Sequence, residues 1–244
     1  MVNSNNALAK SIVIAGDNWC PINCAQDSED KGFMIDLAIE ALALSDYQVT
    51  YVEVPWTRAV ELASKGEVDA IVGAFKNDAP DFIYPQTPLL NISPNNLFTT
   101  QDNEWVYQNI NSLNDVNIGV ITGYDYGDKL NSYLFSKASA KVQQIYGNNT
   151  SSRNIQRLLK KRIDVLVETG PVFWYHAKKL NVLHQVKQVG SVSKSEPCYI
   201  AFSPFLPSSK DISIALDKGV EILRQQGRVK EIADYYGLPA KLYQ

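Results

Sequence analysis

The fold is decided by residues 56–75, which read WTRAVELASKGEVDAIVGAF. The stretch from Trp56 to Lys65 has the pattern of a helix, and Gly66 follows it where a left-handed helix end favours glycine. Residues 68–75 are then almost continuously apolar, as in a strand that a parallel sheet buries on both faces. A helix joined directly to such a strand predicts an α/β fold.

The same alternation continues on both sides of this stretch. Before it, strands are expected at 11–15 and 47–54 around a helix at 33–44. After it, a proline-rich passage leads to a strand at 96–100, and we interpret this passage as a crossing to a second lobe. The pattern then restarts with strands expected at 117–121, 141–146, 163–167 and 185–189 and helices at 126–136, 151–161 and 172–180.

The end of the chain is expected to return to the first lobe, through a strand at 198–202 and helices at 209–225 and 229–236. Alternating strands and helices favour parallel sheets with right-handed crossovers. Ligands of such sheets bind beyond the carboxyl ends of the strands. We therefore predict a lobe 1 of residues 1–97 plus 194–244 and a lobe 2 of residues 98–193, with a ligand cleft between them.

Composition excludes several other classes of protein. The 244 residues exceed one average domain, and a hydrophobic fraction of 45% supplies a core. The 26 acidic and 23 basic side chains leave a net charge of −3, and no extended basic face is evident. No nucleic-acid partner is therefore expected, because such a surface must neutralise phosphates. No stretch reaches the roughly 18 apolar residues that span a bilayer.

Two of the three cysteines, Cys20 and Cys24, flank a short segment of turn-forming residues. We interpret them as a local disulfide, with two free thiols as the alternative. A zinc site would need two further ligands at paired spacing, which Cys198, His176 and His184 do not supply, so no metal is expected. Both histidines are expected at the surface. A disulfide would indicate an oxidising compartment.

Several segments, in order and spacing, resemble the bacterial extracellular solute-binding proteins of family 3, receptors of polar amino-acid uptake systems. The resemblance is carried by Gly32–Asp36, Pro55–Ala59, Gly66–Gly73, Ile118–Gly123, Arg162–Glu168, Ala201–Ser203 and Gly227–Ala233. It implies a two-lobed periplasmic binding protein-like fold of type II. Each lobe would have a mainly parallel sheet flanked by helices, and two hinge crossovers would join the lobes.

The resemblance also implies a periplasmic location. Residues 1–6 lack the basic and apolar regions of a signal peptide. We therefore expect either a cytosolic protein or one whose export signal has been removed, and the resemblance favours the second.

The sequence departs from the family at the two positions that hold an amino acid. Members that bind α-amino acids use an arginine shortly after the third strand, where bidentate bonds hold the carboxylate. Residues 76–82 read KNDAPDF and contain no arginine. The family's aspartate for the amino group falls at Thr169, beside Glu168. The chemistry of the ligand is therefore not evident from the family pattern.

Candidate ligand-binding residues follow the predicted strand ends. Arg58 is the candidate anion anchor, and its loss is expected to weaken binding more than tenfold; a surface ion pair with Glu61 is the alternative. A helix N-terminus after residue 122 would suit an anion, unless Asp125 occupies it. Trp19 is either a cleft wall or a core residue. The full set is Trp19, Trp56, Arg58, Gly73, Ala74, Phe75, Thr122, Tyr124, Tyr126, Glu168 and Thr169.

The common enzyme signatures are missing from the sequence, including the nucleophile elbow, zinc-protease, phosphate-loop and dinucleotide motifs. Glu168 is a candidate general base, but no acid partner can be named for it. We expect a non-catalytic, monomeric receptor without a cofactor for a small polar, amino-acid-like solute, partnered by the membrane permease of an ABC transporter. A ligand-sensing domain partnered by a sensor kinase and a dehydratase-like enzyme are the alternatives.

Overall fold

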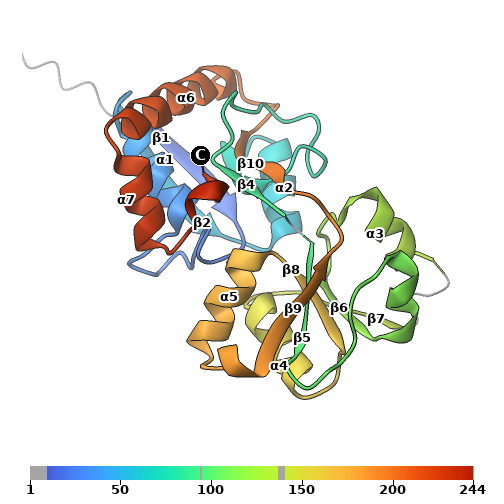
Figure 1. Ribbon diagram of the computed structural model, residues 1–244. Helices are drawn as coiled ribbons and strands as arrows, with labels where there is room; N and C mark the ends of the chain where they lie inside the picture. Colours follow the sequence, from blue (N-terminus) through green and yellow to red (C-terminus); the bar gives the residue numbers. More distant parts are fainter. Residues whose placement is uncertain (1–9, 94, 137–140, 244) are drawn as a thin grey trace, which may run out of the picture.

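The computed structural model describes residues 10–93, 95–136 and 141–243, and it forms two lobes, each built on its own sheet (Figure 1). The sheet of lobe 1 has the strand order β2-β1-β3-β10-β4, and that of lobe 2 the order β7-β6-β8-β5-β9. The strands of lobe 1 are β1 (Lys10–Gly16), β2 (Tyr47–Glu53), β3 (Ala70–Ala74), β4 (Leu90–Ile92) and β10 (Glu196–Phe202). Those of lobe 2 are β5 (Asn96–Thr100), β6 (Ile118–Ile121), β7 (Val142–Ile145), β8 (Val165–Glu168) and β9 (Val186–Ser191).

Both sheets are mixed rather than mainly parallel. In lobe 1, β1 pairs in parallel with β2 and β3, whereas β10 runs antiparallel to β3 and β4. In lobe 2, β6 pairs in parallel with β7 and β8, whereas β5 runs antiparallel to β8 and β9. The antiparallel strands are those that carry the chain between the lobes, so each enters its sheet from the opposite lobe instead of from a local crossover helix.

Helices cover both sheets, and most lie within a few residues of the ranges expected from the sequence. Lobe 1 carries α1 (Phe33–Ala43), α2 (Trp56–Ser64), α6 (Ser209–Gln225) and α7 (Arg228–Tyr235). Lobe 2 carries α3 (Gly127–Leu134), α4 (Thr150–Leu159) and α5 (Gly170–Lys179). Sequence analysis missed β4 and the short 3-10 helices η1 (Ile110–Asp115), η3 (Leu183–Gln185) and η4 (Ala240–Leu242), which are too short to show a period.

Each lobe has its own apolar core. In lobe 1, Phe33, Leu37 and Ala41 of α1 belong to the core cluster, and all are 1% exposed or less. A Cβ atom on Gly219 of α6 would lie 2.2 Å from the carbonyl oxygen of Ala41, so only glycine allows these two helices to pack this closely. In lobe 2, Phe98 stacks on Phe173 with ring centroids 3.7 Å apart.

One of the two histidines lies in this core instead of at the surface. His176 is 5% exposed, and its Nδ1 lies 2.9 Å from Ser152 Oγ. Burial lowers the pKa of His176 to about 4, so the ring is neutral. The surface prediction for His176 was wrong because one face of α5 packs against α4.

The chain passes between the lobes twice, from β4 to β5 and from β9 to β10. Ser93 Oγ lies 2.9 Å from Ser191 Oγ, and the Val192 amide donates to the Asn95 carbonyl at 2.9 Å. The two hinge crossovers implied by the resemblance are present. The residue bounds predicted for the lobes stay a prediction, and residues 1–9 of predicted lobe 1 lie outside the described residues.

No helix in the described ranges combines the length and apolar character that crossing a membrane requires.

Candidate functional site

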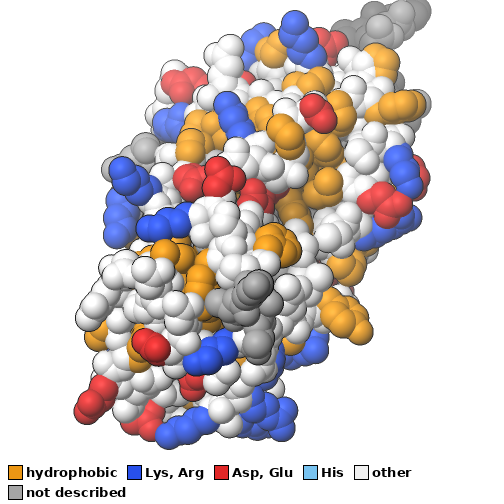
Figure 2. Space-filling view, turned by 90° about the vertical axis from the view of Figure 1, so that its right-hand side faces the viewer, with side chains coloured by type: hydrophobic (Ala, Val, Ile, Leu, Met, Phe, Trp, Pro, Cys, Tyr) orange, Lys and Arg blue, Asp and Glu red, His pale blue; other side chains and the backbone are white. Residues whose placement is uncertain are grey.

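A pocket lies between the lobes, beyond the carboxyl ends of β1, β3, β6 and β8. Lobe 1 contributes seven lining residues and lobe 2 contributes six, with Asn95 of a crossover completing the wall. The interlobe pocket is lined by Asp17, Trp19, Trp56, Val72, Gly73, Phe75, Asp78, Asn95, Tyr124, Asp125, Tyr126, Val167, Glu168 and Thr169. On the face in Figure 2, acidic side chains gather near the middle of the molecule, with hydrophobic side chains beside them.

The lobes are closed over this pocket. The cavity volume is about 40 Å³. That is well below the roughly 150 Å³ of a cavity that holds one benzene. A Cβ on Gly123 of lobe 2 would lie 2.3 Å from Thr57 Cγ2 of lobe 1, so the two lobes touch at the pocket edge. A ligand of several heavy atoms therefore enters only when the lobes move apart.

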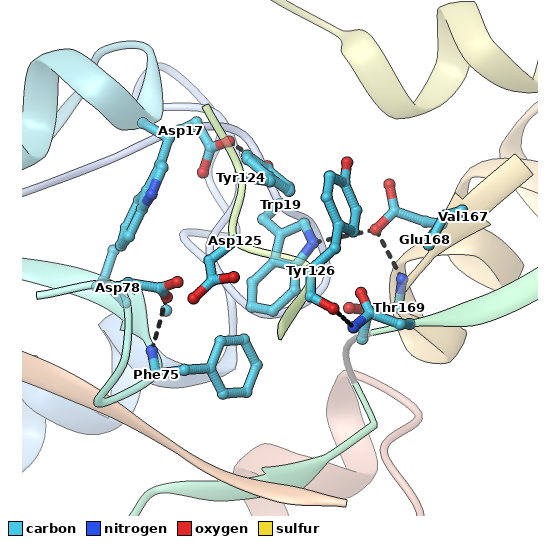
Figure 3. Close-up of a pocket in the computed structure, with 14 residues that line it drawn as sticks. Asp17, Trp19, Phe75, Asp78, Tyr124, Asp125, Tyr126, Val167, Glu168 and Thr169 are labelled. Carbon is cyan, nitrogen blue, oxygen red and sulfur yellow. Dashed lines mark hydrogen bonds between the residues drawn. The ribbon is translucent and has the colours of Figure 1, made fainter. Parts of the chain in front are cut away.

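Trp19 stands at the centre of the pocket (Figure 3). Cys20 and Cys24 form the predicted disulfide, and the Trp19 amide donates to the Asn23 carbonyl at 2.8 Å, which closes the loop. The indole is 6% exposed and meets Phe75 edge-on, with ring centroids 6.4 Å apart. Trp19 is therefore a core residue that also lines the cleft, and its contact with a ligand stays a prediction.

Glu168 joins the lobes at the end of β8. Its Oε1 accepts hydrogen bonds from Trp19 Nε1 at 3.3 Å and from the Thr169 amide at 2.8 Å, and its Oε2 accepts one from Ser151 Oγ at 2.6 Å. Burial raises the pKa of Glu168 to about 7, although these donors oppose the rise, and the Asp17 carboxylate raises it further. Glu168 thus has both oxygens engaged by the protein.

A second cross-lobe contact joins Asp17 and Tyr124. Asp17 follows β1, and its Oδ2 accepts a hydrogen bond from the Tyr124 hydroxyl in the turn after β6. Burial raises the pKa of Asp17 to about 6 against the effect of this bond. Burial, together with the charges of Asp17 and Glu168, also raises the pKa of Tyr124, which keeps its proton for donation.

Asp78 and Asp125 face the pocket from opposite lobes, beside the ring of Phe75 (Figure 3). Asp78 Oδ2 accepts from the Phe75 amide at 2.9 Å, which holds the loop after β3. Burial raises the pKa of Asp78 to about 7, and the charge of Asp125 adds to the rise. Asp125 Oδ1 accepts from the Gly127 amide at 2.7 Å, so a carboxylate already occupies the start of α3.

Comparison with known proteins accounts for this architecture. The sequence matches the bacterial extracellular solute-binding proteins, family 3, over residues 12–239. The chain belongs to this family. The comparison with curated proteins finds no match.

Solved structures share the fold. A substrate-binding protein of an ABC uptake transporter from Streptococcus pneumoniae, with bound histidine, has a TM-score of 0.80 at 19% identity, over 96% of this chain and 95% of that chain. A histidine kinase sensor domain similar to periplasmic binding proteins has a TM-score of 0.76 at 16% identity, over 97% of this chain and 99% of that chain. An ancestral arginine-binding protein bound to arginine has a TM-score of 0.75 at 18% identity, over 94% of this chain and 99% of that chain. The fold is that of the two-lobed type II periplasmic binding proteins.

The pocket of this family 3 protein brings together most residues singled out from the sequence. Those that line it are Trp19, Trp56, Gly73, Phe75, Tyr124, Tyr126, Glu168 and Thr169. Thr169 also takes the N-cap position of α5. Whether these residues bind a ligand stays a prediction.

Three candidates lie outside the pocket. Arg58 points away from it on α2, where its side chain is 48% exposed and pairs with Glu61 at 2.8 Å. Ala74, the last residue of β3, is buried in a core cluster that also contains Ile71. Thr122 is exposed, and its hydroxyl lies 3.4 Å from Gln144 Oε1. The anion anchor expected at Arg58 is therefore not at the site, because the surface alternative holds.

Sequence reasoning missed several lining residues: Asp17, Asp78, Asn95, Val72 and Val167, together with the pocket-facing role of Asp125. A usable signal was present, because Asp17, Asp78 and Asp125 each follow a strand that ends at the cleft. In the loop where family members carry the arginine, the residue that lines the pocket here is the acidic Asp78.

Proposed function

We propose that this protein is a periplasmic receptor that closes its two lobes on a small polar solute and delivers the solute to the permease of an ABC transporter. The observation that carries the proposal is a closed pocket at the strand ends whose walls come from both lobes. A ligand that contacts both walls binds the closed state more tightly than the open state, and this difference drives closure. Membership of a family of extracellular solute-binding proteins supports the same function.

Binding without turnover is favoured by the state of Glu168. A general base needs an oxygen that can reach a substrate proton. Both oxygens of Glu168 already accept hydrogen bonds from protein donors, three in total. The side chain is 3% exposed. In this proposal Glu168 links the two lobes through its hydrogen bond with Trp19, and the protein catalyses no reaction.

A sensing role is the second candidate, because a histidine kinase sensor domain matches 97% of this chain. Sensing and transport use the same closure, and they differ in the partner that reads the closed state. A permease gene adjacent to the gene for this protein would favour transport. A kinase encoded there would favour sensing.

The test is a thermal-shift screen against amino acids, organic amines, organic acids, sugars and short peptides. A ligand at a hundredfold excess over Kd adds about 2.7 kcal/mol of stability. For a chain of this size that corresponds to a rise in Tm of about 5–10 °C. Small-angle X-ray scattering with the ligand should report the closed form.

Trp56→Ala should abolish the shift, because Trp56 lines the pocket. Trp174→Ala, at a 36% exposed position on α5 outside the pocket, is the matched control and should keep it. The proposal fails if no class of solute shifts the Tm, or if both variants respond alike.

A further inference from the structure

The charge of the interlobe pocket identifies a class of ligand. Four of its described lining residues carry a carboxyl group, namely Asp17, Asp78, Asp125 and Glu168, and none of the lining residues that the structure describes is Lys, Arg or His. Two basic side chains close in sequence to lining residues have partners of their own. Arg58 pairs with Glu61 at the surface, and Lys76 Nζ lies 5.4 Å from the ring centroid of Tyr199.

The carboxyl groups face one another across the two lobes. The charge of Asp125 of lobe 2 raises the pKa of Asp78 of lobe 1, and the charge of Asp17 of lobe 1 raises the pKa of Glu168 of lobe 2. Closing the lobes therefore brings like charges together, which costs free energy in a partly desolvated site. A cation between the lobes would remove this repulsion, and closure would then depend on the cation.

Two carboxylate oxygens remain available for such a cation. Asp78 Oδ2 and Asp125 Oδ1 accept from backbone amides, whereas Asp78 Oδ1 and Asp125 Oδ2 have no donor among the described residues. Both side chains point to the space beside Trp19 and Phe75 (Figure 3). An ammonium or guanidinium group is the natural partner for a pair of free carboxylate oxygens.

Aromatic rings form another large part of the wall, contributed by Trp19, Trp56, Phe75, Tyr124 and Tyr126. The faces of such rings attract cations, and their carbon atoms cover alkyl chains. A metal ion would need converging ligands, and no group of three Asp, Glu, His or Cys side chains in the described ranges is placed to hold one. The combination favours an organic cation.

A free carboxylate on the ligand would be unfavourable here. An α-amino acid brings one negative charge into a pocket that has four carboxyl groups and no basic side chain among its described lining residues. The start of α3, which offers amide donors, is already occupied by Asp125. The pocket thus discriminates against amino acids by repulsion as well as by the missing arginine.

We propose that the ligand is a small organic amine or guanidine that carries no carboxylate, bound with its cationic group between Asp78 and Asp125 and its carbon chain against the aromatic rings. This inference rests on the proposed function and deepens it. The amine acts as the bridge between two acidic walls. This ligand has no carboxylate, which distinguishes it from the amino acids bound in the similar solved structures.

The test compares ligand pairs that differ only in the carboxylate. Calorimetric titrations at pH 8 would use 1,5-diaminopentane against lysine and agmatine against arginine, with Ca²⁺ as a metal probe. At least one decarboxylated member should bind ten times or more tightly than its parent amino acid. The inference is overturned if in both pairs the amino acid binds as tightly as its amine, or if Ca²⁺ binds more tightly than both amines.

Variants locate the cation within the pocket. Asp78→Asn keeps an acceptor for the Phe75 amide but removes the charge, and it should weaken amine binding more than tenfold. Asp81→Asn, at an exposed position in the same loop, is the matched control and should leave the affinity within twofold. Arg58→Ala should also leave it within twofold. Equal affinities in the Asp78 and Asp81 variants would contradict the assignment.

Failure of this inference can be told apart from failure of the receptor function. Binding and closure with a sugar, an organic acid or a neutral peptide, without any response to amines, would overturn the cationic ligand and leave the receptor standing. A protein that responds to none of the classes in the thermal-shift screen would remove both.

Discussion

At the scale of single residues, the pocket carboxyl groups differ in how far the protein already satisfies them. Glu168 accepts three hydrogen bonds, whereas Asp78 accepts one. Both have a pKa raised to about 7, with burial as the largest cause. Glu168, whose oxygens are both hydrogen-bonded, holds the lobes together. Asp78, which has one oxygen without a donor among the described residues, is the better partner for a ligand.

These raised pKa values predict how stability depends on pH. The pKa of Glu168 is about 7 in the folded protein and 4.5 as the ordinary value, so the folded state binds more protons between these pH values. The free energy of unfolding of the ligand-free protein should therefore fall as pH rises from 5 to 7.5. The side chains that face Glu168 include Asp17, Tyr124 and Tyr126. The raised pKa of Asp17 also makes the free energy of unfolding fall as pH rises.

Urea unfolding at pH 5, 6 and 7.5 measures this slope. Glu168→Gln removes one of the groups responsible, on the order of 3 kcal/mol at most, and should flatten the slope. Glu221→Gln, at an exposed position on α6, is the control and should leave the slope as in the wild type. A slope that survives in Glu168→Gln would contradict the assignment of this pKa shift.

At the scale of elements, the two lobes use the same device to position their strands. Asp69 precedes β3, and its Oδ2 accepts from the Val13 amide of β1 at 2.8 Å. Asp164 precedes β8, and its Oδ2 accepts from the Asn117 amide just before β6 at 2.7 Å. Each aspartate ties the start of one parallel strand to its neighbour. This explains the aspartate in both 66–73 and 162–168, which the family resemblance had singled out.

Removing either tie should destabilise its own lobe. Asp69→Ala and Asp164→Ala each leave a strand amide without its acceptor, which costs about 1–3 kcal/mol. Denaturant unfolding measures the loss, and hydrogen exchange should place it in lobe 1 for the first variant and in lobe 2 for the second. Asp128→Ala, at an exposed position on α3, should change stability by less than about 0.5 kcal/mol. Equal exchange across both lobes in either variant would argue against a local tie.

At the scale of the whole molecule, hydrogen bonds between the lobes favour closure. Tyr124 donates to Asp17, and Trp19 donates to Glu168. The same closure brings acidic side chains from the two lobes together. The hydrogen bonds favour the closed state and the repulsion favours the open state, which suits a protein whose ligand must decide between them.

Tyr124→Phe should shift this balance toward the open state. It removes one hydrogen bond to a charged acceptor, worth about 1.5–3 kcal/mol, or roughly tenfold or more in the equilibrium. Small-angle scattering of the ligand-free protein should show a larger radius of gyration, and ligand affinity should fall with the closed population.

Tyr126→Phe is the matched control for this prediction. The Tyr126 hydroxyl accepts from the Ile121 amide at 2.7 Å, a bond within lobe 2 that opening does not break. This variant should lose stability but keep the radius of gyration of the wild type. An identical change in both variants would show that Tyr124 has no special part in closure.

The sequence by itself determined the α/β class, the order of nearly all helices and strands and the resemblance to the family, and it favoured the disulfide over free thiols. These features follow from local patterns, such as the buried strand at 68–75 and Gly66 after a helix, which depend on neighbours in the chain. β4 was missed because a three-residue strand in a proline-rich passage has no period to detect.

Only the tertiary structure decided which side chains share the pocket. Arg58 and Trp56 lie two residues apart on α2, yet the helical turn directs one to the surface and the other to the cleft. Asp17 and Glu168 are 151 positions apart and become neighbours only when the lobes close. The acidic residues of the site are scattered along the sequence, where none of them stands out. They form an acidic pocket only in the folded chain, because electrostatic interactions depend on distance in space and not on separation along the chain.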